Sequence, residues 1–363
     1  MTSVWTAAAV AQIAAAPYPA LPVITAAEVV PVTPGIDLWD LWPLQAADGS
    51  IASIAGGELW FALSAPVAGD PLARHAAARI RTLRHAAGGW QDLGPTLPDG
   101  FSPGSREWSG SAVLTDGQVT LYFTAAGRRG EVAMTYEQRL FAATAMLTGG
   151  ALTSWRDCRE TVAADGAMYV RAAEAQGAVG TIKAFRDPGW CRDPADAAEY
   201  LLFAGSDATS ASAWNGVIGA AQRSGDDWAL LPPLVTAAGV NNELERPHLL
   251  VREGRYHLFW STQRSVFARP GPSGPTGLYG MVADSFAGPY RPLNGTGLVL
   301  ANPPEAGGQA YSWLVLPDLR VVSFVDRWGI ADDIALDAAT ARRHFGGVPA
   351  MFHQLTIAGD RAW

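Results

Sequence analysis

The sequence is poor in charged residues and in cysteine. Only 17% of its 363 residues are charged, and its two cysteines are Cys158 and Cys191. Neither cysteine has a second one at a metal-ligand spacing such as C-x-x-C, and the six scattered histidines form no zinc motif. The sequence allows one disulfide between the two cysteines, but we favour two buried free thiols.

Clusters of positive charge and long apolar runs are also missing. The formal net charge is −8, and the chain has no run rich in Lys or Arg, so we expect neither nucleic acid nor a membrane as a partner. The longest apolar runs are far shorter than a membrane span. We expect a monomer or a weak homo-oligomer.

The N-terminus lacks the positive charge that begins a signal peptide. Met1–Ile13 contains no Lys or Arg, and the alanine-rich stretch Thr6–Ala16 predicts a short helix instead. Without a signal peptide, a secreted or periplasmic protein would use an unconventional route or would be shown here without its leader, and we expect one of these two cases. A cytoplasmic location is the alternative.

Turn-forming residues and tryptophan, by contrast, are abundant. The sequence has 39 Gly, 25 Pro and 14 Trp, and 49% of its residues are hydrophobic, which is enough for a large core. From residue 37 onward short strands alternate with turns, and Thr115-Asp116-Gly117 indicates a hairpin. A helical pattern returns only weakly, around Glu174. The predicted strands are 58–63, 78–83, 111–114, 119–123, 199–204, 217–222, 248–251, 256–260, 278–283 and 321–325.

Aromatic residues, most of them followed by Leu or Pro, recur at intervals of 62 to 73 positions, at Trp90, Trp155, Trp228 and Tyr290. Units of this size with about four strands each are typical of propeller blades. We therefore predict an all-β, five-bladed β-propeller, with a large β-sandwich as the alternative. A single catalytic domain would cover residues 1–363, with residues 1–35 forming the N-terminal helix and an extended wrap.

The stretch Asp37–Gln45 places two carboxylates and two tryptophans within six residues. Because Asp is depleted in strands and a buried carboxylate needs partners, we interpret this stretch as poor material for an ordinary core strand. A carboxylate held among indole rings at the mouth of a pocket would suit both kinds of side chain, and such a mixture is typical of sugar-binding sites. A surface loop with a buried Trp is the alternative.

Polar stretches recur once in each predicted blade. With Asp40, Ser109, Asp187, Arg246 and Tyr311 as markers, the separations are 69, 78, 59 and 65 residues, which is the blade period. The innermost strand of each propeller blade begins near the central channel, so we expect the five stretches to meet at one end of it. Asp37 has no counterpart in the other stretches, and we assign it a structural or loop role.

A pocket with several carboxylates suits the cleavage of a glycosidic bond. That reaction needs one carboxylate as nucleophile or base and one carboxylic acid as proton donor, and crowding drives their pKa values apart. A calcium site is the competing use of such acids. The Trp and Arg residues that recur in these stretches disfavour a bound cation, so we predict no metal and no cofactor.

Simpler explanations exist for several of these residues. Arg186-Asp187 and Glu245-Arg246 could be structural ion pairs. Ser109 lacks the G-x-S-x-G context of a serine nucleophile. His248 follows a proline at a strand start, where histidine is more often a structural hydrogen-bonding residue than a base.

With these stretches in order, the sequence resembles glycoside hydrolase family 68, which contains levansucrases, inulosucrases and bacterial β-fructofuranosidases. The likeness covers nearly the whole chain. The motifs that carry it are Trp39-Asp40-x-Trp42-Pro43-Leu44-Gln45, Glu107-Trp108-Ser109-Gly110-Ser111, Tyr136-Glu137, Arg186-Asp187-Pro188, Glu243-x-Glu245-Arg246-Pro247-His248 and Gly277-Leu278-Tyr279-Gly280.

The resemblance implies a five-bladed β-propeller and a retaining, double-displacement reaction on sucrose, with fructo-oligosaccharides as acceptors. By motif position, Asp40 would be the nucleophile, Glu245 the acid/base and Asp187 the stabiliser of the transition state. The positions implied for substrate binding are Trp39, Trp108, Ser109, Arg186, Glu243, Arg246, Gln263 and Tyr311.

The sequence departs from the family pattern at three positions. Gln263 stands where members that make long levan usually carry Arg or His, so we predict short products or plain hydrolysis. Ala204 and Asn242 stand where many members carry Glu and Asp, which disfavours the calcium site of Gram-positive members.

The function that these features favour is a levansucrase-like fructosyltransferase, which releases glucose from sucrose and transfers fructose to water or to sugars. The first alternative is an invertase-like β-fructofuranosidase. An alternative of another class is a carbohydrate-binding propeller without catalysis, which the presence of all three acids disfavours. The context of Trp42–Gln45 disfavours a related enzyme that acts on arabinofuranosides.

Overall fold

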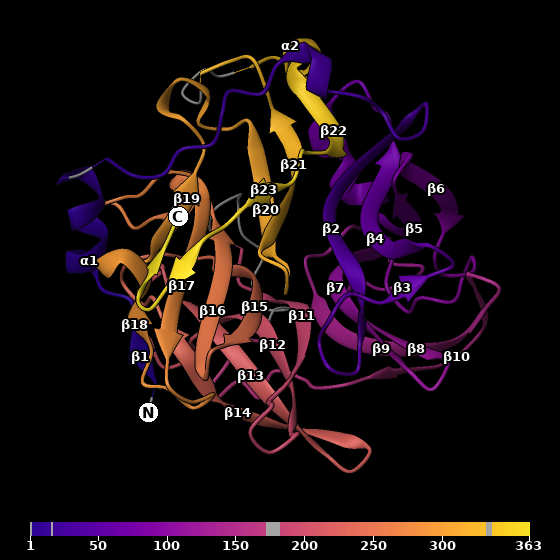
Figure 1. Ribbon diagram of the computed structural model, residues 1–363, viewed down its shortest axis with the longest axis horizontal. Helices are drawn as coiled ribbons and strands as arrows, with labels where there is room; N and C mark the ends of the chain where they lie inside the picture. The colour runs from indigo at the N-terminus through magenta and orange to yellow at the C-terminus, as the bar shows by residue number, and fades with distance from the viewer. Residues whose placement is uncertain (1, 16, 172–181, 332–335) are drawn as a thin grey trace.

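The computed structural model describes residues 2–15, 17–171, 182–331 and 336–363. Its sheets follow one another around the molecule, from β2 on the right of Figure 1, through β14 at the bottom, to β22 at the top. This ring of five blades confirms the prediction of an all-β, five-bladed propeller. The weak helical pattern around Glu174 lies outside the described residues.

Each blade is an antiparallel sheet, and a short parallel pairing between β2 and β7 joins the first two. Blade 1 consists of β2 (Ile36–Ala46), β4 (Gly57–Pro66), β5 (Arg79–Ala86) and β6 (Gly89–Pro95), with β3 (Ser53–Ile54) beside β4. Blade 2 consists of β7 (Arg106–Thr115), β8 (Gln118–Ala126), β9 (Gln138–Thr148) and β10 (Ala151–Glu160). Blade 3 consists of β11 (Phe185–Arg192), β12 (Glu199–Ser206), β13 (Gly216–Ser224) and β14 (Asp227–Thr236), extended by β1 (Ser3–Val4).

The last two blades are less regular at their outer edges. Blade 4 consists of β15 (Glu245–Arg252), β16 (Arg255–Thr262), β17 (Gly277–Ala283), β18 (Arg291–Pro292) and β19 (Leu298–Ala301). Blade 5 consists of β20 (Ala310–Val315), β21 (Arg320–Arg327), β22 (Phe345–Pro349) and β23 (His353–Gln354). The remaining elements are α1 (Ala7–Ala11), α2 (Ala338–His344), the 3-10 turns η1 (Gln12–Ala15), η2 (Ala26–Glu28), η3 (Pro71–Ala77), η5 (Arg264–Val266), η6 (Leu293–Gly295) and η7 (Pro304–Ala306), and the hairpin β24 (Ile357–Ala358) and β25 (Arg361–Ala362).

The strand predictions agree with the observed strands. Every predicted strand overlaps an observed one, and the hairpin at residues 115–117 joins β7 to β8. Its two turn residues, Asp116 and Gly117, have φ of 51° and 79°, the left-handed conformation that a tight two-residue hairpin turn requires. The repeated aromatic residues mark the outer part of each of the first four blades. Trp90, Trp155 and Trp228 lie in β6, β10 and β14, and Tyr290 directly precedes β18.

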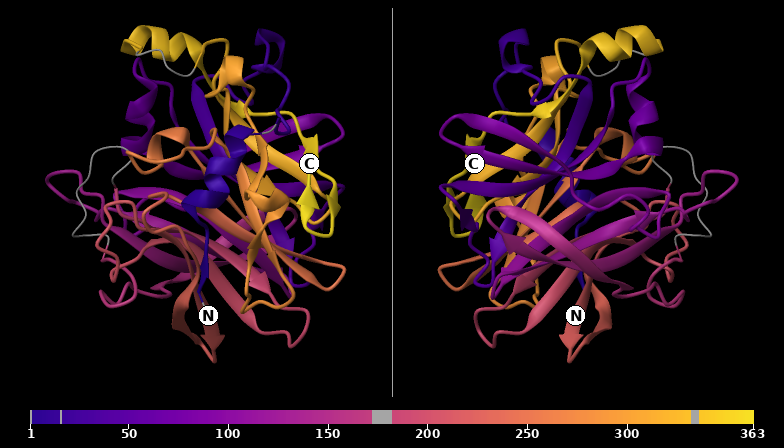
Figure 2. Two further views of the ribbon diagram at one scale, coloured as in Figure 1. Left: turned by 90° about the vertical axis from the view of Figure 1, so that its left-hand side faces the viewer. Right: turned by 90° about the vertical axis from the view of Figure 1, so that its right-hand side faces the viewer.

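The N-terminal segment binds across blades 3 and 4. The predicted short helix is present as α1, and Thr6 caps it by accepting a hydrogen bond from the Ala9 N–H at 3.2 Å. Before it, β1 pairs in parallel with β14 of blade 3. The fully buried Trp5 donates its indole N–H to the Thr296 carbonyl of blade 4 at 2.8 Å and packs edge-on against Trp260. Figure 2 shows this segment running along the outside of the propeller.

Two smaller sequence expectations concern the cysteines and the membrane. Cys158 and Cys191 are both free thiols, Cys191 buried and Cys158 half-buried, so the interpretation without a disulfide is confirmed. Among the residues that the structure describes, no helix has both the length and the apolar character needed to cross a membrane.

Candidate active site

Each of the five innermost strands carries a β-bulge near its beginning. A bulge interrupts the ladder between two strands and turns side chains in new directions. In four blades the bulge contains a non-glycine residue with positive φ. These residues are Asp40, Asp187, Arg246 and Ser312, with φ of 50°, 62°, 51° and 64°. The ladder shifts lie between Trp39 and Trp42, Trp108 and Gly110, Arg186 and Gly189, Glu245 and His248, and Tyr311 and Leu314.

The bulge of blade 2 depends on glycine. Gly110 follows Ser109, and a Cβ atom at this position would lie 1.8 Å from the Tyr122 carbonyl oxygen. The neighbouring strand β8 therefore leaves room only for a residue without a side chain. In this way blade 2 presents Ser109 at the same position at which the other blades present their positive-φ residues.

The bulges create two sets of equivalent side chains, one from each blade. The first set directly precedes the bulge and consists of Trp39, Trp108, Arg186, Glu245 and Tyr311. The second set consists of Asp40, Ser109, Asp187, Arg246 and Ser312. All ten residues line one cavity of about 490 Å³, within the usual size of a small-molecule site. Glu243 and Gln263 line it too, so the cavity contains every residue that the sequence indicated for the site.

The structure corrects two details of the sequence interpretation. The interpretation of Asp37–Gln45 as poor strand material is wrong, because residues 36–46 form the strand β2. The bulge at Asp40 lets its carboxylate leave the ladder while Leu38, Leu41 and Leu44 stay buried. The fifth marker is also shifted by one residue, because Ser312, not Tyr311, has the positive φ shared with Asp187 and Arg246.

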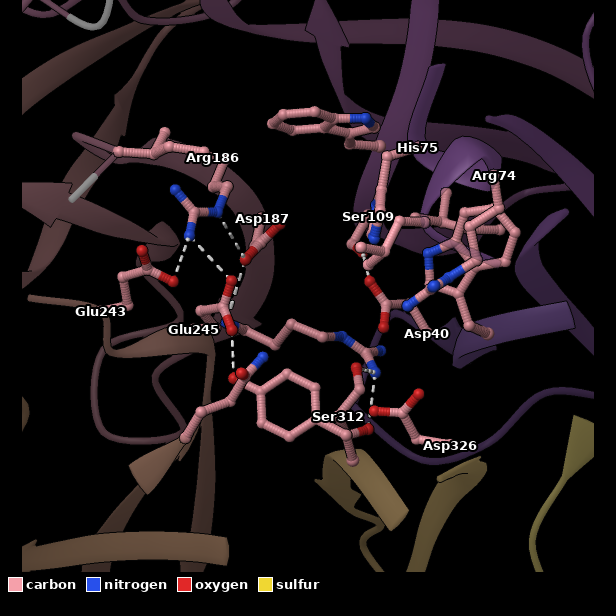
Figure 3. A pocket seen from close by; sticks show the side chains of 18 of the residues that line it. Asp40, Arg74, His75, Ser109, Arg186, Asp187, Glu243, Glu245, Ser312 and Asp326 are labelled. Atoms are coloured by element: carbon pink, nitrogen blue, oxygen red, sulfur yellow. Dashed lines mark hydrogen bonds and ion pairs between the residues drawn. The ribbon is translucent and has the colours of Figure 1, made fainter. Parts of the chain in front are cut away.

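Glu245 is held on both of its carboxylate oxygens. Nη2 of Arg186 lies 2.7 Å from Oε1 of Glu245 and 3.2 Å from Oε2 of Glu243. The hydroxyl of Tyr311 donates a hydrogen bond to Oε2 of Glu245. Figure 3 shows Arg186 lying between the two glutamates. A single guanidinium from blade 3 thus orients Glu245 at the start of blade 4 and Glu243 just before it.

Asp187 and Arg246 extend this network to the neighbouring blades. The Asp187 carboxylate accepts a hydrogen bond from the Arg246 backbone N–H at 3.2 Å and lies 3.9 Å from Nε of Arg186. The Arg246 guanidinium donates to the Ser312 carbonyl at 2.9 Å, to the Ser312 hydroxyl at 2.7 Å and to the Leu41 carbonyl at 2.6 Å. Arg246 therefore fixes the beginnings of the inner strands of blades 5 and 1 relative to blade 4.

Asp40 lies across the pocket from Glu245, as Figure 3 shows. The Ser109 hydroxyl donates a hydrogen bond to Oδ2 of Asp40 at 2.5 Å. Asp40 is half-buried, whereas Asp187 and Glu243 are buried. Of these carboxylates, Asp40 is thus the more open to a molecule that enters the cavity.

Burial raises the pKa of Asp187 and of Glu243 to about 7. The Arg186 cation lowers both values, and the negative charge of Glu245 raises both. Like charges around one cation disfavour full ionisation, so this group of carboxylates can retain a proton near neutral pH. Proton exchange with a sugar oxygen requires a site with such properties.

The sequence analysis missed three pocket residues with ionisable side chains, all of them outside its motifs. Arg74 and His75 lie on η3, between β4 and β5, and Asp326 lies near the end of β21. The Arg74 guanidinium packs over the Trp39 ring at 5.5 Å, and the His75 ring lies 6.0 Å from that of Trp39. None of the three belongs to an innermost strand, so the blade period does not reveal them. The only sequence signal for Arg74 and His75 is that they form an Arg-His pair within an alanine-rich connection.

Two residues near the pocket have structural partners. Asp37, predicted to have a structural or loop role, lies buried within β2 and forms an ion pair at 2.6 Å with the partly exposed Arg342. His248 has both ring nitrogens occupied, Nδ1 by the Arg246 carbonyl and Nε2 by the Val315 N–H, each at 2.9 Å. These bonds agree with the structural role expected for His248. Within the described part of the chain, no three His, Cys, Asp or Glu side chains are grouped so as to hold a metal ion.

The fold and the cavity together define a five-bladed β-propeller with a pocket of carboxylates, guanidinium groups and indole rings, which is suited to a sugar. The levansucrase/invertase family model, that of glycoside hydrolase family 68, matches residues 1–217 and 206–341. The chain is 32% identical to a levansucrase of Rahnella aquatilis over 90% of its own length and 85% of that protein. It is 31% identical to a levansucrase of Zymomonas mobilis, with 90% and 81% covered. The chain belongs to glycoside hydrolase family 68.

Solved structures support the same assignment. An inulosucrase from Halalkalicoccus jeotgali, bound to kestose, superposes with a TM-score of 0.90 at 36% identity, covering 100% of this chain and 95% of that one. A full-length β-fructofuranosidase from Microbacterium saccharophilum superposes with a TM-score of 0.83 at 27% identity, covering 100% and 82%. The propeller is therefore shared with enzymes named for fructosyl transfer and for hydrolysis.

Proposed function

We propose that this protein cleaves sucrose with retention of configuration and transfers the fructosyl group to water or to sugar acceptors. The observation that carries the proposal is that Asp40 of blade 1 and Glu245 of blade 4 line one cavity with Trp39 and Trp108. Retaining glycosidases need such a pair, a carboxylate nucleophile and a carboxylic acid, on either side of the bond that breaks. Levansucrase and inulosucrase relatives support sucrose as the donor.

The first step forms a fructosyl-enzyme. The Asp40 carboxylate attacks the anomeric carbon of the fructosyl unit, and the bond from this carbon to the glucosyl oxygen breaks. Glu245 gives its proton to that oxygen, so glucose leaves as a neutral alcohol. The Asp187 carboxylate, buried beside Arg186, offsets the positive charge that develops on the ring.

The second step regenerates the enzyme. Glu245, now ionised, takes the proton of an incoming hydroxyl group, whose oxygen attacks the anomeric carbon and displaces Asp40. Water as acceptor gives fructose, and a sugar as acceptor gives a longer oligosaccharide. Trp39, Trp108 and Ser109 line the side of the cavity around Asp40, where we assign the fructosyl unit. Glu243, Arg246 and Gln263 lie on the blade 4 side, where we assign the glucosyl unit or the acceptor.

The test is incubation with sucrose while free glucose is followed. We expect glucose release by the unaltered protein and a loss on the order of 10⁴-fold in Asp40→Asn, because no covalent intermediate can form. Asp116→Asn is the matched control, since Asp116 is an exposed residue with φ of 51°, close to the 50° of Asp40. Its activity should equal that of the unaltered protein. Absence of glucose release, or an Asp40→Asn variant with full activity, would overturn the proposal.

The balance between transfer and hydrolysis is a second measurable property. We propose transfer with short products, because Gln263 lines the cavity at the position where, by the family resemblance, members that make long levan carry Arg or His. A clear deficit of free fructose relative to glucose indicates transfer. Equal amounts indicate the alternative, an invertase-like hydrolase, which the likeness to a β-fructofuranosidase keeps open. Chromatography of the products distinguishes the two.

A further inference from the structure

The chain contains a single lysine. Of its 26 basic Lys and Arg residues, all are arginine except Lys183, which lies three positions before Arg186 and directly before blade 3. The one lysine of the sequence thus lies close to the pocket. The surroundings of Lys183 give a physical reason for a lysine at this position.

The Lys183 ammonium uses all of its donors on uncharged oxygens. Nζ donates to Oδ1 of Asn215 at 2.6 Å, to Oδ1 of Asn242 at 2.9 Å and to the Ala213 carbonyl. A lysine ammonium has three N–H donors and no acceptor, so this set is complete. The acceptors come from the connection before β13 and from the segment before β15. One cation therefore ties three separate parts of the chain together.

One of the three acceptors, Asn242, is hydrogen-bonded to Glu243, which lines the pocket. Because Oδ1 of Asn242 accepts from Lys183, its Nδ2 faces the other way and donates to Oε1 of Glu243 at 3.3 Å and to the Ile182 carbonyl at 3.0 Å. The other oxygen of Glu243 lies 3.2 Å from Arg186, which also binds Glu245. The ammonium thus fixes the orientation of the amide that holds Glu243 against Arg186.

The geometry favours a compact cation over a guanidinium. Gly216 packs so closely on the Asn242 backbone that a Cβ atom at residue 216 would lie 2.7 Å from the Asn242 carbonyl oxygen. Little space remains between these segments. An ammonium is a small charge with three diverging donors, whereas a guanidinium is a wide planar group suited to paired oxygens in one plane. Three converging oxygens in a narrow space call for the former.

We propose that Lys183 is a positioning residue for the active site, whose ammonium group acts as a built-in cation that holds the Asn242 amide, and through it Glu243, in place. The inference rests on the proposed function, because Glu243 is assigned there to the glucosyl side of the pocket. Lys183 itself contacts no reacting atom. Its removal should therefore weaken substrate binding more than it slows the chemical steps.

The test compares Lys183→Ala with Lys183→Met, whose side chain fills much of the same space without a charge. We expect both to raise KM for sucrose about tenfold and to lower kcat less than about threefold. Added n-propylammonium, which replaces the atoms that Lys183→Ala removes, should restore KM in that variant and leave Lys183→Met unchanged. Tetramethylammonium at equal ionic strength has no N–H and should restore neither.

A third variant tests the same contacts in case Lys183→Ala does not fold stably. Asn215→Ala keeps the ammonium and removes one acceptor, so KM should rise roughly threefold. Folded variants with sucrose kinetics within about twofold of the unaltered protein, or equal effects of n-propylammonium on Lys183→Ala and Lys183→Met, would overturn the proposal. If the unaltered protein does not cleave sucrose, the proposed function fails separately. Thermal unfolding then tests whether the ammonium holds these parts of the chain together, since n-propylammonium should raise the Tm of Lys183→Ala alone.

Discussion

Asp40 in blade 1 and Glu245 in blade 4 face the same cavity, yet a charged donor holds Glu245. Asp40 accepts a hydrogen bond from the neutral hydroxyl of Ser109. Glu245 accepts from the neutral hydroxyl of Tyr311 and from the Arg186 cation, which also lies against Glu243 and Asp187. The Ser109 hydroxyl thus serves one carboxylate, whereas the Arg186 guanidinium serves three. Removal of the Ser109 hydroxyl should therefore affect one carboxylate, whereas removal of the Arg186 cation should affect three.

The roles of the two carboxylates can be distinguished with two donor substrates whose leaving groups differ in their need for a proton. In Glu245→Gln we expect glucose release from sucrose to fall about 10³-fold, because the leaving oxygen receives no proton. A β-fructofuranosyl fluoride needs no such proton, since fluoride departs as an anion. This variant should therefore release a burst of fluoride equal to the enzyme concentration, followed by a slow phase.

Asp40→Asn supplies the control for that measurement. Without a nucleophile it should give no burst with either donor, although Glu245 and its partners are intact. Rapid-mixing assays of fluoride and glucose distinguish the variants. Equal losses on both donors in Glu245→Gln would contradict the assignment of Glu245 as the acid.

Removal of the shared cation should have the next largest effect. In Arg186→Met we expect kcat/KM for sucrose to fall on the order of 10²-fold, because three carboxylates lose one partner. Arg186 lowers the pKa of Asp187 and Glu243, which burial raises to about 7, so its loss raises both pKa values further. If Asp187 must be ionised, the acidic limb of the pH–rate profile moves to higher pH. An acidic limb at an unchanged pH would show that Arg186 does not control the protonation of these carboxylates.

Removal of the neutral donor should have a smaller effect. In Ser109→Ala the Asp40 carboxylate loses one hydrogen bond, and we expect kcat/KM to fall roughly tenfold. The pH–rate profile should keep its shape, because no charge is added or removed. A shift of the profile as large as that of Arg186→Met would remove the distinction between the two sides of the pocket.

Substitution of Glu107 should have the smallest effect on activity and a clear effect on stability. It is buried beside Trp108, borders a second cavity of about 330 Å³, and accepts a hydrogen bond from the Ile80 N–H at 2.8 Å. Burial raises its pKa to about 7 from an ordinary value of 4.5. The folded protein therefore binds this proton more tightly than the unfolded chain, and stability is lost as pH rises from 4.5 to 7.

Glu107→Gln keeps the acceptor and removes the charge. We expect the variant and the unaltered protein to be equally stable near pH 4.5, and the variant to be more stable by about 3 kcal/mol at pH 8. Sucrose cleavage should stay within about twofold, because Glu107 is not among the residues of the active-site cavity. Denaturant midpoints at the two pH values give the difference. A stability difference that does not change with pH would contradict the assigned pKa.

The blade period explains why the sequence indicates so much of this pocket. Each blade repeats one arrangement of strands, so residues at the same phase, such as Asp40 and Asp187, reach the same end of the channel. The conformation at those positions could not be predicted, because long-range contacts stabilise it. The positive φ of Arg246 accompanies hydrogen bonds to Leu41 and Ser312, which are distant in sequence.

Local residue preferences fail to predict two other features, the strand β9 and the pocket residues Arg74 and His75. Gln138–Thr148 forms β9 although its alanines give little strand signal, because β8 and β10 pair with it on both sides. Arg74 and His75 lie on a connection between strands, where neither the blade period nor alternation in the sequence applies. Tertiary packing decides the structure at both places.

The N-terminal segment is synthesised first but binds to blades that are synthesised later. Ser3 and Val4 pair with Val235 and Thr236, and Trp5 binds Thr296, so the residues made first meet partners made much later. At roughly 5 to 20 residues per second, Thr236 follows Val4 by about 12 to 46 seconds. At least until that point, Trp5, Val10 and Ile13, all buried in the finished protein, lack the strand against which their segment binds. A ribosome that stalls before the third blade is complete thus presents an apolar segment that a chaperone can bind.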